Sequence, residues 1–197
     1  MHVTDLPVER LRWYLRPMFW LQHRRYGQHL APAKVWARVP ALYWALTGFY
    51  AAIERRRSPI DAALRSLVQT RVSQINHCAF CIDLNASISA QRSGSLDKAL
   101  AVDRWRESDA FGPRERLALE YAEAITRTDG QVTDVLVAAL RQHFDEAALI
   151  ELTGLVAFQN LSSKFNAALD IPAQGFCRSH RDDHSELSAR LTDPSAL

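Results

Sequence analysis

Apolar residues recur every three or four positions through the middle of the chain, the spacing of one face of an α-helix. The pattern is clearest after Ser58, where it comprises Ile60, Leu64, Leu67, Val68, Val72 and Ile75. Ser58 followed by Pro59 suits a helix N-cap and first helical position, so we predict a helix from there to about Asn76. No stretch of useful length alternates apolar and polar residues as a half-buried strand does. The pattern therefore predicts an all-α protein.

Five further helices are expected to end near residues 92, 105, 127, 144 and 169. Ser93-Gly94 suits the first of these ends, because glycine favours the left-handed backbone that closes many helices. Pro113, Thr133 and Asp145 mark three of the helix starts. The last helix is apolar over much of its circumference, which predicts a position at the centre of the domain or in a subunit interface.

Residues 1–57 have a different character, because they hold most of the aromatic residues together with several arginines. Pro7, Pro17, Pro32 and Pro40 divide this region into short helices. We predict a helical, aromatic-rich N-terminal extension (1–57) packed on a helical core domain (58–177), followed by a poorly ordered tail (178–197). A membrane-surface or anion-binding arm is the alternative for the extension, but its apolar residues outnumber those of a surface helix.

Composition and charge exclude several classes of protein. The 197 residues suit one domain with an appendage, and 48% hydrophobic with 23% charged residues is an ordinary globular balance. A formal net charge of +2 gives no case for nucleic-acid binding. No apolar run approaches the roughly 20 residues that a membrane span needs, and the N-terminus lacks the pattern of a signal peptide. We therefore expect a cytoplasmic protein that binds neither nucleic acid nor membrane.

The sharpest chemical feature is the sequence Cys78-Ala79-Phe80-Cys81. Two cysteines three positions apart in the first turn of a helix have their sulfurs on nearly the same side, where they can form a disulfide or share a metal ion. The unpaired N–H groups and the dipole of a helix N-terminus also favour a thiolate, the reactive form in peroxide reduction and disulfide exchange. In a chain with three cysteines and no export signal, a redox-active pair is the preferred interpretation.

Two other interpretations of the cysteine pair are open. A structural zinc site needs four ligands, and beyond the pair the sequence offers only Cys177 and, in the predicted tail, His180 and His184. We therefore expect no metal. The pair is otherwise an inert pair of small core residues, because buried cysteine is common in proteins.

Three runs of sequence resemble the alkyl hydroperoxide reductase D-like branch of the carboxymuconolactone decarboxylase family: residues 67–84, which hold the cysteine pair, residues 112–124 and residues 165–172. The resemblance implies the helical bundle of that branch, a homo-oligomer, and thiol-dependent peroxidase or disulfide oxidoreductase activity on a small-molecule peroxide or disulfide. It also implies that no cofactor is needed, that an unidentified thiol supplies electrons, and that Cys81 attacks while Cys78 resolves.

The chain departs from the peroxidase members of this branch at two positions. Those proteins carry a Glu twelve residues before the first Cys and a His four residues after the second, and this pair relays a proton from the thiol. Here the positions hold Ser66 and Asn85, which form hydrogen bonds but take up no proton near neutral pH. His77, next to Cys78, is a candidate substitute, and an exposed residue at the helix start is the alternative.

The remaining polar residues near the motif are assigned structural roles. Asp83 is expected to face solvent or a neighbouring subunit, Glu120 and Glu123 to form ion pairs, and Cys177 to take no part. Because the relay residues are replaced, a second function stays open: a binding or assembly protein on the same fold that has lost turnover. In that protein the aromatic N-terminal half forms a pocket or a partner surface. A redox sensor, whose disulfide changes the oligomeric state, is the third.

Overall fold

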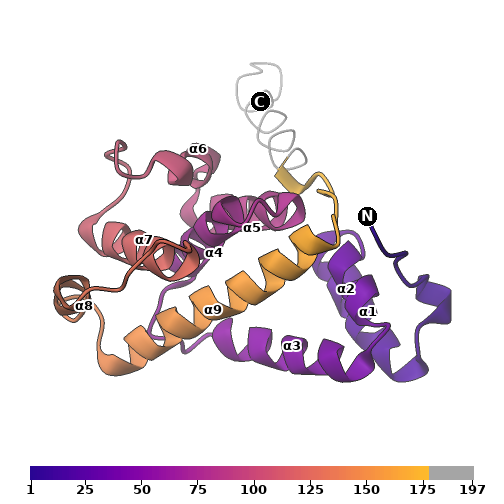
Figure 1. Cartoon of the computed structure of the whole chain (residues 1–197). Coiled ribbons are helices and arrows are strands. Elements are labelled where there is room, and N and C mark those ends of the chain that lie inside the picture. The colour runs from indigo at the N-terminus through magenta and orange to yellow at the C-terminus, as the bar shows by residue number, and fades with distance from the viewer. Residues whose placement is uncertain (178–197) are drawn as a thin grey trace, which may run out of the picture.

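A computed structural model describes residues 1–177, in which helices and turns make up the whole fold and no strand occurs (Figure 1). This confirms the all-α prediction; the predicted poorly ordered tail, with His180 and His184, lies outside the described residues. The helices are α1 (Arg16–Tyr26), α2 (Ala31–Trp36), α3 (Pro40–Ile53), α4 (Ala62–Ile75), α5 (Ala79–Ser93), α6 (Leu96–Leu100), α7 (Pro113–Thr126), α8 (Asp134–Leu140) and α9 (Glu146–Ala168). Short 3₁₀ turns lie at Val8–Arg10, Trp13–Leu15 and Ala101–Arg104.

The helix starts follow local capping chemistry, with one correction. The predicted cap at Ser58 is wrong: α4 begins at Ala62, and the carboxylate of Asp61 accepts the N–H of Leu64 at 2.8 Å. Ser58 instead donates to Glu151 on α9 at 2.7 Å, which uses its hydroxyl in a tertiary contact. The predicted cap at Asp145 is confirmed, because its side chain accepts the N–H of Ala148 at 2.7 Å.

Of two predicted helix ends, the structure confirms one and places the other earlier in the chain. Gly94 closes α5 with a left-handed backbone, as expected. The helix predicted to reach residue 144 stops earlier, because α8 ends at Leu140 and a turn follows. Phe144 is nevertheless buried in the main core, so the apolar periodicity reflects burial beyond the end of the helix.

Helix α4 lies at the centre of the molecule, against α5, α7 and α9 (Figure 1). Its residues Leu64, Val68 and Val72 enter the main core together with side chains of α7, α8 and α9. Leu67 enters a separate cluster with Trp105 and Phe111, among others. Because α4 is covered on several sides, its polar side chains are also buried and must find partners inside the protein.

Helix α9 packs against α3, α4, α5 and α7, while one face that includes Ile150 and Leu161 stays exposed, so both positions predicted for the last helix stay open. Two aromatic residues of the N-terminal region stack on it: Trp36 of α2 stacks on Phe165, and Phe49 of α3 stacks on Phe158. Figure 1 shows α3 running beside α9. Among residues 1–177, no helix combines the length and apolar character that crossing a membrane requires.

Candidate active site

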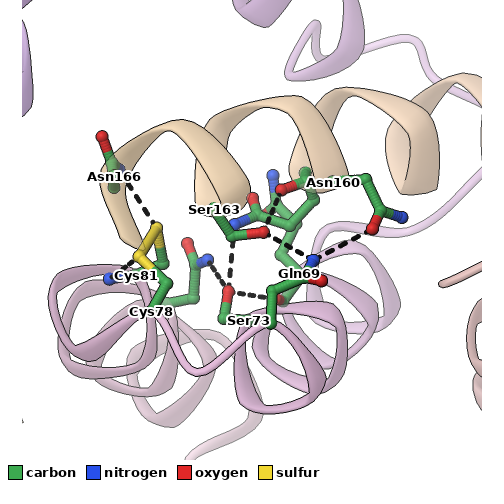
Figure 2. The surroundings of a disulfide bond; sticks show 10 residues. Gln69, Ser73, Cys78, Cys81, Asn160, Ser163 and Asn166 are labelled. Carbon is green, nitrogen blue, oxygen red and sulfur yellow. Dashed lines mark hydrogen bonds between the residues drawn. A yellow bond between two sulfur atoms is a disulfide. The ribbon is translucent and has the colours of Figure 1, made fainter. Parts of the chain in front are cut away.

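The cysteine pair lies at the sharp reversal between α4 and α5 (Figure 2). His77 has a left-handed backbone (φ 52°), and this conformation turns the chain so that Cys78 becomes the N-cap of α5. Cys81 lies one turn further on, and the two residues form a disulfide with their Cα atoms 5.2 Å apart. The predicted juxtaposition of the two sulfurs is therefore observed, at a separation that supports a redox role for the pair.

Both sulfurs are buried and hydrogen-bonded. Cys78 and Cys81 are 1% and 4% exposed. The backbone N–H of Cys81 donates to Cys78 Sγ at 3.2 Å, and the side-chain amide of Asn166 donates to Cys81 Sγ at 3.2 Å. Donors of this kind stabilise a thiolate in the reduced protein, as does the N-terminus of α5. Within residues 1–177, no side chain that titrates hydrogen-bonds to either sulfur.

A chain of neutral polar groups extends from the pair between α4, α5 and α9 (Figure 2). The hydroxyl of Ser73 lies at its centre: it donates to the carbonyl of Gln69 at 2.6 Å and accepts from Asn85 at 3.1 Å and Gln159 at 2.9 Å. Further along, Ser163 accepts from the amide of Asn76, which also bonds to Asn160. This network holds the reversal between α4 and α5 rigidly against α9 without placing a charge beside the sulfurs.

The three supporting residues predicted from the sequence lie in different surroundings. Asn85 is in the network and lines the cavity described below. Ser66 is fully buried, and its hydroxyl donates to the carbonyls of Ala62 and Ala63 in its own helix. His77 is exposed, and among residues 1–177 it forms no hydrogen bond with either sulfur. The structure thus brings only Asn85 into the polar surroundings of the pair.

Asp83 is buried within the chain, whereas the sequence predicts that it faces solvent or a neighbouring subunit. Its side chain is 8% exposed, and the two carboxylate oxygens accept the backbone N–H groups of Gln174, Gly175, Phe176 and Cys177 at 2.6–3.0 Å. Cys177 also donates its thiol to the carbonyl of Asp83. Asp83 therefore fixes the segment after α9 against α5, and no sequence signal pointed to this contact.

Glu123 forms ion pairs, as predicted, whereas Glu120 is exposed. The Glu123 carboxylate binds Arg71 at 2.5 Å and Arg106 at 2.7 Å, and accepts the indole N–H of Trp105 at 3.0 Å. Burial opposes its ionisation, but these hydrogen bonds and charges outweigh burial and lower the pKa of Glu123. The cluster joins α4, through Arg71, to α7.

A cavity of about 450 Å³ opens beside Cys81, and its wall includes Cys81, Asn85 and Asn166 but not Cys78. We call it the aromatic cavity, because Tyr26, Trp36, Tyr43, Tyr50, Phe80 and Phe158 line it. Most of these rings come from α1, α2 and α3. The N-terminal region therefore supplies a wall of the site, as expected for the binding-protein alternative, in which its aromatic residues form a pocket.

The aromatic cavity also has a polar side formed by residues that sequence analysis did not single out. Tyr50 and Glu54, near the C-terminal end of α3, lie in its wall. Burial, and to a lesser extent the nearby Tyr26 and Glu54, raises the pKa of Tyr50 above its ordinary value. The hydroxyl of Tyr50 therefore stays protonated. Among residues 1–177, no group of three or more side chains suits a metal ion.

The chain is similar to known proteins in both sequence and fold. Residues 40–124 match the model of the carboxymuconolactone decarboxylase family. The uncharacterised protein YnjA of Escherichia coli K12 is 48% identical over 172 residues, which cover 87% of this chain and 94% of YnjA.

Two solved structures share the fold. One is a peroxidase-related protein from Silicibacter sp. TM1040, with a TM-score of 0.80 and 20% identity over 88% of this chain and 93% of that one. The other is a cysteine-to-alanine variant of the debrominase Bmp8 in complex with 2,3,4-tribromopyrrole, with a TM-score of 0.80 and 21% identity over 93% of this chain and 97% of that one.

Proposed function

We propose, on the premise that this chain belongs to the carboxymuconolactone decarboxylase family, that it is a thiol-dependent oxidoreductase in which Cys78 and Cys81 alternate between dithiol and disulfide. The observation that carries the proposal is the disulfide at the N-terminus of α5, with one sulfur in the wall of the aromatic cavity. Inert core cysteines would need neither feature.

In the peroxidase form of the reaction, the Cys81 thiolate attacks the terminal oxygen of a hydroperoxide. The O–O bond breaks, the alcohol leaves with a proton, and Cys81 becomes a sulfenic acid. Cys78 then attacks the Cys81 sulfur, so that water leaves and the disulfide forms. A dithiol reductant restores both thiols by exchange, in which its own sulfurs become a disulfide. With a small disulfide as substrate, the same pair reacts by exchange alone.

Two contacts support Cys81 as the attacking residue. Cys81 lines the aromatic cavity, whereas Cys78 does not. The Asn166 amide also donates to Cys81, and an N–H donor favours the thiolate. Cys78, as N-cap, lies behind it, where it can reach the oxidised sulfur without facing the substrate.

The absence of an acid–base relay at Ser66 and Asn85 changes how the thiol is activated. Ser66 donates to its own helix, and Asn85 donates to Ser73, so neither takes up the proton of Cys81. We assign activation to the N-terminus of α5 and to Asn166, with the proton lost to solvent. His77 contributes only its backbone conformation, which sets the position of Cys78.

A second candidate activity is reductive removal of a halogen from an aromatic ring. The ring-lined cavity beside Cys81 favours it, and Bmp8, described as a debrominase, has the same fold. The dithiol would supply two electrons and two protons: the carbon–halogen bond breaks, a carbon–hydrogen bond forms, hydrogen halide leaves, and the cysteines become a disulfide. A halide-release assay distinguishes it from peroxide reduction.

We also propose that the chain forms a homo-oligomer, as the family resemblance implies. A binding or redox-sensing role without turnover is the competing proposal, and the loss of the relay residues favours it. Sizing-column elution of the oxidised and reduced protein separates the sensor, because a sensor changes its oligomeric state.

The decisive experiment measures consumption of an organic hydroperoxide with dithiothreitol as the dithiol. Wild type is compared with Cys81→Ser, Cys78→Ser and, as the matched control, Cys177→Ser. We expect both substitutions in the pair to remove turnover above background and Cys177→Ser to retain it. A bromopyrrole substrate with halide detection is run in parallel. Equal background rates for wild type and Cys81→Ser with both substrates, and also with a small disulfide, would refute the enzymatic proposal.

A further inference from the structure

The Glu54 carboxylate has one oxygen in ion pairs and one without a partner. Its side chain is 8% exposed. Oε2 binds Arg92 at 2.6 Å and lies 3.6 Å from Arg65. Oε1 is buried and accepts no hydrogen bond from residues 1–177. Glu54 also lies in the wall of the aromatic cavity, so the unpartnered acceptor belongs to a residue that borders this space.

The charges around Glu54 indicate what kind of donor suits it. Two guanidinium groups, from Arg65 and Arg92, already exceed the charge of the single carboxylate. A third, from Arg25, also lies in the cavity wall. A ligand ammonium would meet these like charges, whereas a neutral hydroxyl or ring N–H would satisfy Oε1 without adding charge. The site therefore favours a neutral hydrogen-bond donor.

The walls of the cavity indicate the rest of the ligand. The aromatic rings named above surround a space of about 450 Å³, and aromatic side chains favour stacked or edge-to-face contact with another ring. Eleven residues separate Cys81 from Arg92 along α5, which corresponds to about 16 Å of helix. Because Arg92 binds Glu54, Cys81 and Glu54 lie at different points along the cavity wall.

We infer that the aromatic cavity binds a neutral aromatic molecule that carries a hydroxyl or ring N–H, with this donor on Oε1 of Glu54 and the opposite side of the ring toward Cys81. The inference deepens the proposed function, because it names a ligand class for the same site, and it rests on that function for the ligand to be a substrate. Glu54 is a specificity-determining residue in this arrangement and needs no contact with the sulfurs.

The test uses two pairs of probes that differ only in the donor: 2-naphthol with 2-methoxynaphthalene, and indole with 1-methylindole. Binding to the full-length disulfide form is measured by calorimetry. We expect 2-naphthol to bind about tenfold tighter than its ether, and indole to exceed 1-methylindole similarly, as one hydrogen bond to a charged acceptor predicts. Equal affinities within both pairs would overturn the inference.

Variants locate the bound probe. Glu54→Leu should bring the affinities within each pair together while the ring still binds. Because this variant leaves two arginines without their carboxylate, Leu46→Trp serves as a second test that keeps the ion pairs. Leu46 lines the cavity, so a tryptophan there should abolish binding of all four probes. Leu161→Trp, at a half-exposed position outside the cavity, is the matched control and should bind as wild type does.

The outcomes also separate this inference from the proposed function. Unchanged probe binding in Leu46→Trp would show that the probes bind elsewhere and would overturn the inference. Donor-selective binding without any thiol turnover would refute only the enzymatic proposal. Thiol turnover without donor selectivity would refute only the ligand class.

Discussion

The side-chain amide of Asn166, near the end of α9, donates a hydrogen bond to the sulfur of Cys81 at 3.2 Å, across 85 positions of sequence (Figure 2). Asn166 is itself 1% exposed, so solvent does not compete for the contact. This pair joins the last long helix to the redox centre, and it makes the reactivity of Cys81 depend on a residue that the cysteine motif does not contain.

Replacing Asn166 with Asp should raise the pKa of Cys81. The amide donor is lost and a carboxylate takes its place, and both changes disfavour the thiolate, by about one pH unit or more. In a Cys78→Ser background, the midpoint of iodoacetamide alkylation against pH should therefore move upward. Asn160→Asp is the control, because Asn160 lies on the same helix but bonds to Asn76 and Thr126. A midpoint that moves equally in both variants would contradict the assignment.

Cys81 should be alkylated faster than Cys78 in the reduced wild-type protein. Both thiols are almost fully buried, but only Cys81 lines the aromatic cavity, through which a reagent approaches. Peptide mapping by mass spectrometry after short exposure to iodoacetamide measures the order. Leu46→Trp should slow the modification of Cys81, and Leu161→Trp should leave it unchanged. Faster modification of Cys78 would reverse the proposed roles of the two thiols.

Glu123→Gln should lower the free energy of unfolding by about 3 kcal/mol, because it leaves the buried Arg71 without its carboxylate. Glu120→Gln, one turn away and exposed, should change it by less than about 0.5 kcal/mol. Urea unfolding at pH 7 measures both. Equal effects of the two substitutions would show that the Glu123 cluster contributes nothing specific.

The same carboxylate gives a pH dependence. The pKa of Glu123 is lowered in the folded protein, so its stabilising contribution is complete above the unfolded value of 4.5 and is lost as the pH falls through the folded value below it. Wild type should therefore lose more stability than Glu123→Gln between about pH 5 and pH 3, the range in which carboxyl groups titrate. Parallel curves for the two proteins would contradict the lowered pKa.

Asp83→Ala should release residues 174–177 from α5. Four backbone N–H groups lose their acceptor, and we expect a loss of about 2–3 kcal/mol in the free energy of unfolding. Hydrogen exchange at these amides should accelerate more than exchange in α4. Asp109→Ala, at an exposed position, is the control and should leave both measurements unchanged. Unchanged exchange at residues 174–177 in Asp83→Ala would show that the carboxylate does not hold the segment.

Several elements of the fold could be predicted because their causes are local. Asp145 and Gly94 act on backbone groups within a few residues, and the spacing of Cys78 and Cys81 brings their sulfurs together within one helical turn. Where a tertiary contact competed, prediction failed: the hydroxyl of Ser58 binds Glu151 on α9, and Asp61 caps α4 instead. Capping chemistry alone did not decide between them.

The sequence by itself determined the helical class of this protein and the pair of cysteines at a helix start, because periodicity, capping and a three-residue spacing act over one or two turns. Only the tertiary structure decided that Asn166 reaches Cys81, that Asp83 is enclosed by residues 174–177, and that Glu54 lies in the wall of an aromatic cavity. These contacts join residues that are far apart in the sequence and meet only when the helices pack. Packing depends on which faces of distant helices meet, and no short stretch of the chain specifies that arrangement.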